Sequence, residues 1–174
     1  ISLFIGFEDG ELIEWNTATD NTSNLLNLNS IEKIAECNSI DLIAIASNNK
    51  IILTDFEGNK LDSISVSSDI LDLDWNPSGN KLSVVYDFSD LRIFRAEIQS
   101  GVYNLLQEPR INRSNLPHLT KAEWVSNNSI MLSSKANNLV EYWNTNGNLI
   151  FDFDIHKSEI KSLSSWNNKV LSST

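Results

Sequence analysis

The stretch Leu3–Asn16, LFIGFEDGELIEWN, decides the fold class. Two short apolar runs lie on either side of Glu8, Asp9 and Gly10. Acidic residues followed by glycine favour a tight turn between two strands. The stretch therefore predicts a β-hairpin whose second strand ends at Trp15.

Short runs of the same kind continue along the rest of the chain. Leu71–Trp75 and Phe151–Ile155 alternate apolar residues with aspartates, which is the two-residue period of a half-buried strand. Further strand-like runs are Ser2–Phe7, Leu12–Trp15, Leu42–Ala46, Ile51–Phe56, Lys81–Tyr86, Leu91–Phe94, Ile130–Ser133 and Leu139–Trp143. Turn clusters rich in Asn, Gly and Pro separate these runs, so the chain is predicted to be all-β.

Two series of bulky residues recur with a longer period. An apolar residue closes a predicted strand at Cys37, Trp75, Trp124 and Trp166, with spacings of 38, 49 and 42 residues. An aromatic residue closes another at Trp15, Phe56, Phe94 and Trp143, with spacings of 41, 38 and 49 residues. Both series give a repeat of about 40 residues, which is typical of a repeat architecture. Both also lengthen between Phe94 and Trp124, so an insertion is predicted at 104–118.

A repeat of about 40 residues with four strands resembles the WD40 family of β-propellers. In Leu3–Asn16, Trp15 follows Asp9 by six residues, as in that family, and Asn16 stands where the family often has Asp. Trp143 and Asn144 repeat this ending, and His156–Ser173 resembles the opening of a further repeat. The resemblance implies four-stranded antiparallel blades around a central channel, and the family usually closes its ring with seven blades.

The predicted blades divide the chain as one propeller segment, 1–174. The divisions are a partial blade at 1–30, blades at 31–66, 67–107 and 119–155, the insertion at 104–118, and a partial blade at 156–174. Because the chain starts at Ile1 within a blade and has no initiator Met, we expect about half of a longer propeller. In the alternative, Ile160–Trp166 completes the first blade and closes a four-bladed ring.

Composition excludes several classes of function. The 174 residues carry a formal charge of −10, which argues against a phosphate-backbone binder and against a polybasic membrane-surface module. A single cysteine excludes an internal disulfide framework and a Cys-rich zinc site. No apolar run reaches the roughly 18 residues of a membrane span, and no phosphate-binding glycine loop or nucleophile-elbow motif occurs.

The residues that could carry chemistry also fit structural roles. His118 and His156 lack the spacing of a metal site, and the WD40 resemblance implies that His156 hydrogen-bonds within its own blade. Cys37 is surrounded by apolar residues and is expected in the core. The five tryptophans, recurring at equivalent strand ends, are likewise predicted to pack between blades. We therefore predict no catalytic residue, no metal ligand and no cofactor.

Paired carboxylates are the main argument for an enzyme. Asp72 and Asp74 are predicted on an inner strand, where they point into the interface between blades or into the channel. Asp152 and Asp154 are predicted on an outermost strand, where solvent is the expected environment. A glycosidase needs two carboxyl groups about 5–10 Å apart across a pocket, so a propeller-type glycosidase or lyase is an alternative function.

The favoured function is a non-catalytic scaffold that binds other proteins within a larger assembly. The predicted partner-binding residues are Arg110 and Arg113 in the insertion, with His118 at its end, because arginine binds carboxylates through two parallel hydrogen bonds. The acidic remainder of the chain suits partners with basic or peptide-like segments. With no signal peptide and one unpaired cysteine, an intracellular location, cytoplasmic or nuclear, is expected.

A phosphoinositide- or nucleic-acid-binding propeller is the second alternative. It requires a basic face, for which the candidates are Arg110, Arg113 and Lys121. Phosphoinositide-binding propellers carry a Phe-Arg-Arg-Gly run, and Phe94–Glu97 departs from that run at its third and fourth positions. We therefore expect neither a nucleic-acid nor a membrane partner.

Overall fold

The computed structural model describes residues 1–174 except 88–89, 110–117, 137, 155 and 167–168. The described part of the chain contains strands and no α-helix, which confirms the all-β prediction. The strands are β1 (Ser2–Gly6), β2 (Glu11–Asn16), β3 (Asn21–Asn27), β4 (Lys33–Cys37), β5 (Leu42–Ser47), β6 (Lys50–Asp55), β7 (Lys60–Ser65), β8 (Ile70–Trp75), β9 (Lys81–Tyr86), β10 (Asp90–Gln99), β11 (Val102–Gln107), β12 (Leu119–Ser126), β13 (Ser129–Ser134), β14 (Val140–Asn144), β15 (Leu149–Phe153), β16 (Ser162–Trp166) and β17 (Lys169–Ser173).

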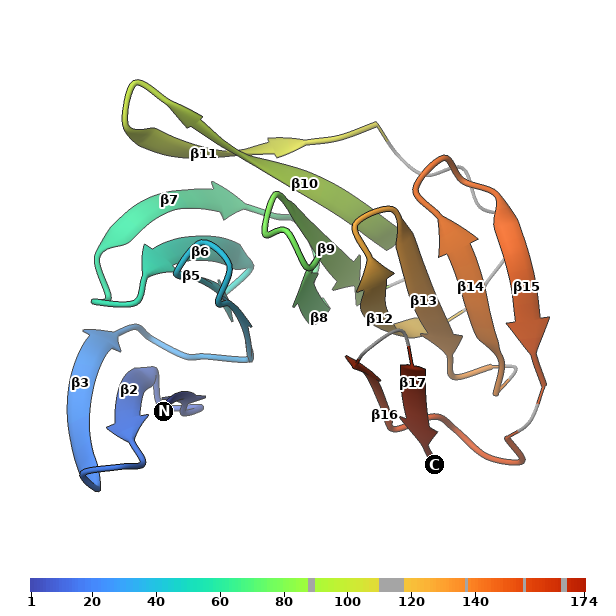
Figure 1. Ribbon diagram of the computed structural model, residues 1–174, viewed down its shortest axis with the longest axis horizontal. Coiled ribbons are helices and arrows are strands. Elements are labelled where there is room, and N and C mark those ends of the chain that lie inside the picture. Colours follow the sequence, from blue (N-terminus) through green and yellow to red (C-terminus); the bar gives the residue numbers. More distant parts are fainter. Residues whose placement is uncertain (88–89, 110–117, 137, 155, 167–168) are drawn as a thin grey trace.

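The strands form separate sheets in which each strand pairs with its neighbour in the chain. The first sheet is β1–β3, the second β4–β7, the third β8–β11, the fourth β12–β15, and the fifth β16–β17. Figure 1 shows the sheets as an arc, with β4, β8, β12 and β16 on its inner side. Neighbouring inner strands contact one another. The prediction of four-stranded antiparallel sheets in a partial propeller is therefore confirmed.

The structure does not form the four-bladed ring. Among the described residues, β16 pairs only with β17 and does not join β1. The two ends of the chain lie at opposite ends of the arc in Figure 1.

Burial explains why the middle strands β5 and β13 carry only apolar residues and serines. Every residue of β5, LIAIAS, and of β13, SIMLSS, is buried, because sheets pack against both faces of these strands. A strand covered on both sides has a continuous apolar sequence, whereas a half-exposed strand alternates. The outer strands β3 and β15 are mostly exposed and carry polar or mixed sequences.

The predicted core position of the tryptophans holds for three of them. Trp75, Trp124 and Trp143 are buried between neighbouring sheets, as is Cys37. The indole Nε1 of Trp75 donates across an interface to the carbonyl of Ala35 at 3.1 Å. Trp15 is only half-buried.

The Gly10 turn admits no other residue. Gly10 has a φ of +100°, and its N–H donates to the carbonyl of Phe7 at 2.9 Å. A Cβ atom at this position would lie 2.0 Å from the carbonyl oxygen of Leu28, which is backbone and cannot rotate away. Glycine is therefore required both by the left-handed backbone and by the close approach of a second segment.

Two predictions about the third sheet need correction. β10 does not end at Phe94: it continues to Gln99, because Arg95–Gln99 pairs with Val102–Leu106 across a turn. Residues 104–107, which the prediction included in the insertion as well as in a blade, form the end of β11. The excess residues that lengthen the repeat therefore follow Gln107.

Candidate functional site

The hairpin β10–β11 extends beyond the rest of its sheet. Asp90–Arg95 pairs with β9, whereas Ala96–Gln99 pairs only with β11. Ser100 and Gly101 join the two strands with φ values of 54° and 80°. Two consecutive residues with positive φ form the turn that suits the right-handed twist of a two-residue hairpin. Figure 1 shows the hairpin reaching over β7 of the second sheet.

Contacts with the second sheet hold this overhang in place. The backbone N–H of Leu105 donates to Oδ2 of Asp62, on β7, at 2.8 Å. Leu105 is buried, and Ala96 and Tyr103 pack against the core between the second and third sheets. An isolated two-stranded hairpin is marginal in water, so packing on the neighbouring sheet is what orders the overhang.

The overhang exposes apolar side chains beside a pocket. Ile98 is 62% exposed and Val102 is 56% exposed. A pocket of about 280 Å³ lies under the hairpin and next to two turns at the same end of the sheets; it is lined by Ile40, Ser78, Gly79, Asn80, Ala96, Ile98 and Tyr103. Exposed apolar groups around a pocket are typical of an interaction site.

The sequence contained a signal for this hairpin. Ser100-Gly101 is a turn-forming dipeptide, and Ile98 and Val102 lie on either side of it. The repeat spacing instead predicts a strand end at Phe94 and gives no hairpin over residues 95–102. Local turn chemistry was the better guide at this position.

Of the predicted partner-binding residues, the structure describes only His118. Arg110 and Arg113 fall outside the described residues. His118 is exposed, has a φ of 58°, and directly precedes β12; its carbonyl accepts a hydrogen bond from the N–H of Lys135 at 2.9 Å. Since β11 runs from the hairpin tip to Gln107, the connection towards His118 leaves from the opposite end of the third sheet.

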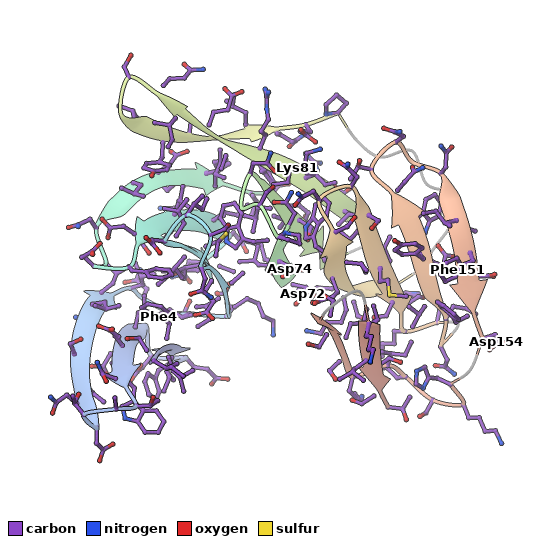
Figure 2. All side chains as sticks on the ribbon, in the orientation of Figure 1. Phe4, Asp72, Asp74, Lys81, Phe151 and Asp154 are labelled. Carbon is purple, nitrogen blue, oxygen red and sulfur yellow. The ribbon has the colours of Figure 1, made fainter. Side chains whose placement is uncertain are left out.

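The inner-strand carboxylates point into the interface between the third and fourth sheets (Figure 2). Asp72 accepts hydrogen bonds from Nζ of Lys121 at 3.1 Å and from the N–H of Ala122 at 3.0 Å. Asp74 accepts the N–H of Trp124 at 2.7 Å. These N–H groups lie on the edge of β12 that faces away from its partner β13, so each aspartate satisfies an otherwise unpaired backbone donor.

The same arrangement recurs one sheet further along. Oε1 of Glu123 on β12 accepts the N–H of Ser165 on β16 at 2.6 Å, and Oγ of Ser165 donates to the carbonyl of Trp124 at 2.7 Å. Carboxylates immediately before the closing tryptophans thus link successive inner strands. This linking role accounts for Asp72, Asp74 and Glu123.

Burial raises the pKa of these carboxyl groups. The pKa of Asp74 lies well above its ordinary value, first because of burial and then because of the nearby Glu123 charge. Burial also raises the pKa of Asp72, opposed mainly by the Lys121 ammonium, and the pKa of Glu123. Raised carboxyl pKa values are common at catalytic sites, but the oxygens named above are engaged by neighbouring strands.

The other chemical candidates do not form a site in the described residues. Asp152 and Asp154 are exposed at the outer side of the arc, where Figure 2 labels Asp154. In the described part of the chain, no three His, Cys, Asp or Glu side chains are arranged to hold a metal ion. The predicted hydrogen bond of His156 within its own sheet is confirmed, because its Nε2 lies 2.6 Å from Oγ of Ser172 on β17.

Two basic residues in the described part of the chain form ion pairs with acidic residues. Lys121, predicted as part of a basic face, pairs with Asp72 on the inner side of the arc. Arg95 pairs with Glu97 at 2.9 Å.

Among the described residues, no helix is long and apolar enough to cross a membrane.

Radially arranged, four-stranded antiparallel sheets linked through their inner strands define a β-propeller, and this chain is a segment of one that is similar to WD40 propellers. The family model of the anaphase-promoting complex subunit 4 WD40 domain matches residues 34–115. A comparison with curated proteins found no match.

Solved propeller structures resemble the chain over most of its length. The β-propeller domain of Cps50 (Swd1) from Myceliophteria thermophila is 14% identical and superposes with a TM-score of 0.74, over 93% of this chain and 54% of that one. A chain of the Mitotic Checkpoint Complex is 15% identical with a TM-score of 0.71, over 93% of this chain and 51% of that one. The present chain thus spans about half the length of the propellers that it matches.

Proposed function

We propose that this propeller segment belongs to a non-catalytic scaffold that binds other protein subunits within a larger complex. The observation that carries the proposal is the hairpin β10–β11, which holds apolar side chains in solvent on a rigid stack of sheets. The acidic groups of the inner strands, which an enzyme could have used, are instead bonded to neighbouring strands.

The comparisons support the same proposal at the level of the fold. The matching family model describes a subunit of the anaphase-promoting complex, and one of the similar structures is a chain of the Mitotic Checkpoint Complex. Propellers present many loops on a rigid ring, and such surfaces suit the binding of peptides and subunits. An intracellular location, cytoplasmic or nuclear, is part of the proposal, because the single Cys37 has no disulfide partner within the chain.

Affinity purification of the tagged full-length protein, followed by size-exclusion chromatography and mass spectrometry, tests the scaffold function. We expect one or more proteins to co-elute with it in near-stoichiometric amounts at physiological salt. Elution as a free monomer, without a stoichiometric partner, would contradict the proposal.

We further propose that Arg110, Arg113 and His118 contact carboxylates of a partner. Replacing Arg110 and Arg113 with Glu should weaken the capture of that partner about tenfold, because like charges then face one another. The thermal unfolding temperature should not change. Quantitative mass spectrometry of the captured partner measures the effect.

A matched charge reversal separates a specific contact from a change in net charge. Lys157→Glu combined with Lys169→Glu alters the formal charge equally, at two exposed positions outside the insertion. This control should retain the partner. Equal loss in both double variants would show that the arginines act only through net charge.

A further inference from the structure

The two faces of the β10–β11 hairpin have different environments. Ile98 lies directly opposite Tyr103 in the pairing register, so both side chains lie on the face that lines the pocket. Val102 is opposite Gln99 and, one position along the strand from Tyr103, points to the other face. Ile98 and Val102 are thus similarly exposed residues, of which only Ile98 borders the pocket.

The pocket under the hairpin has an apolar lining with a polar border. Ile40, Ala96, Ile98 and Tyr103 supply the apolar part, and the turn at Ser78–Asn80 supplies hydroxyl, amide and backbone groups. Its volume of about 280 Å³ accommodates a large aliphatic side chain. Pockets of this composition bind through apolar contact, while a few polar groups fix the orientation of the ligand.

Among the described residues, the charged groups at this end of the second and third sheets are mostly acidic. The strand pairing places the hairpin tip at the same end of the sheets as the turns that follow Cys37 and Asp55, and these turns carry the exposed residues Asp41 and Glu57, with Glu36 one residue before Cys37. The nearby cations Lys81 and Arg95 are paired with Glu108 and Glu97, at 3.4 and 2.9 Å, while Lys60 is exposed. The charge balance therefore favours a basic ligand.

We propose that this pocket docks a short segment of a partner protein in which a bulky aliphatic side chain is flanked by Lys or Arg. The aliphatic side chain enters the pocket against Ile98 and Tyr103, and the flanking cations lie near Asp41 and Glu57. The proposal rests on the scaffold function and adds to it a surface and the chemistry of the partner.

Peptide display on the full-length protein provides the probe. A library of random twelve-residue peptides is selected on the wild-type protein in the presence of excess soluble Ile98→Asp variant, so that retained peptides depend on Ile98. We expect these peptides to be enriched in Leu, Ile or Met beside Lys and Arg. Fluorescence anisotropy of labelled retained peptides then gives dissociation constants.

Matched variants test the apolar contact. Ile98→Asp should raise the dissociation constant about tenfold or more, as for an anchor residue in a pocket. Val102→Asp introduces the same group at a similarly exposed position on the opposite face. This variant should change the dissociation constant about twofold at most. Because both side chains are mostly solvent-exposed, both variants should keep the wild-type unfolding temperature.

A second pair of variants tests the charge. Asp41 has a φ of 53°, which asparagine adopts readily, so Asp41→Asn removes the charge without backbone strain. It should weaken binding about two- to fivefold at low salt, and less at high salt. Asp20 has a φ of 56° on a turn of the first sheet, and Asp20→Asn should have no effect.

Other outcomes overturn the proposal. Equal losses with Ile98→Asp and Val102→Asp, or retained peptides without basic residues, would show that the pocket is not the site described. A wild-type dimer in sedimentation velocity that Ile98→Asp dissociates would make a second copy the occupant. If the full-length protein has stoichiometric partners but no peptide depends on Ile98, only the pocket proposal fails; if it has no partners, the scaffold function itself fails.

Discussion

Replacing Trp124 with alanine is expected to lower the free energy of unfolding by about 3–5 kcal/mol. The side chain is 2% exposed and packs between the third and fourth sheets with Val85, Ile130 and Leu132. Its Nε1 donates to the carbonyl of Asp74 at 3.2 Å. Alanine would leave a cavity at the interface between two sheets and would remove one of the two hydrogen bonds that the Asp74 carbonyl accepts, the other coming from Oγ of Ser83 at 3.1 Å.

Urea unfolding of the full-length protein, followed by tryptophan fluorescence and circular dichroism, measures this loss. Trp15→Ala is the matched control, because Trp15 ends a strand in the other series but is only half-buried; its effect should be smaller. A cost below about 1 kcal/mol for Trp124→Ala would show that this residue is not part of the core.

Replacing Asp74 with alanine is expected to cost about 1–3 kcal/mol, because the buried N–H of Trp124 loses its acceptor. Asp74→Asn keeps an acceptor oxygen in the same place. At neutral pH, Asp74→Asn should therefore be at least as stable as the wild type, since it also removes a buried charge facing Glu123 and Asp72.

The difference between wild type and Asp74→Asn should depend on pH with a definite sign. The pKa of Asp74 in the folded protein lies well above the value of 3.8 expected when it is unfolded. The folded state therefore binds this proton more tightly, and wild-type stability rises relative to Asp74→Asn as the pH falls through the raised pKa towards 3.8. Above the raised pKa the difference is constant.

Urea unfolding of both proteins between about pH 4 and pH 8 checks this sign. Asp72 and Glu123 are present in both, so their own titration largely cancels in the comparison, apart from their coupling to Asp74. A difference that stays constant over the whole range would mean that Asp74 titrates normally. Burial would then not govern the ionisation of Asp74.

The inner and middle strands could be predicted from sequence because burial leaves a pattern. The strand-like run Lys81–Tyr86 coincides with β9, and Cys37, Trp75 and Trp166 end β4, β8 and β16. Residues that must fill the space between two sheets are large and apolar at each repeat. The spacing of these residues therefore indicates the architecture even though the repeats are degenerate.

Three of the outer strands, β3, β7 and β11, could not be predicted in the same way. β3 has the sequence NTSNLLN, and most of its residues are exposed. With little to bury, such a strand carries no alternation, and its place is set by hydrogen bonds to the preceding strand, which the sequence does not display. β7 and β11 were missed for the same reason.

The proposed interaction site could be predicted only in its general character. Composition predicts an acidic surface suited to basic partners, but not the hairpin; of the residues predicted to bind a partner, Arg110 and Arg113 lie outside the described residues and His118 directly precedes β12. The overhang depends on the contact between Asp62 and Leu105, residues 43 positions apart in the chain. No local pattern encodes such a contact.

The β10–β11 hairpin of the third sheet packs on the second sheet, and this contact has a mechanical consequence. The second and third sheets cannot hinge apart at their outer sides unless Leu105 is pulled from its buried place and from the carboxylate of Asp62. The second and third sheets are thus held together at their outer strands as well as at their inner strands. A force applied to Ile98 by a tethered molecule would be shared by two sheets rather than one.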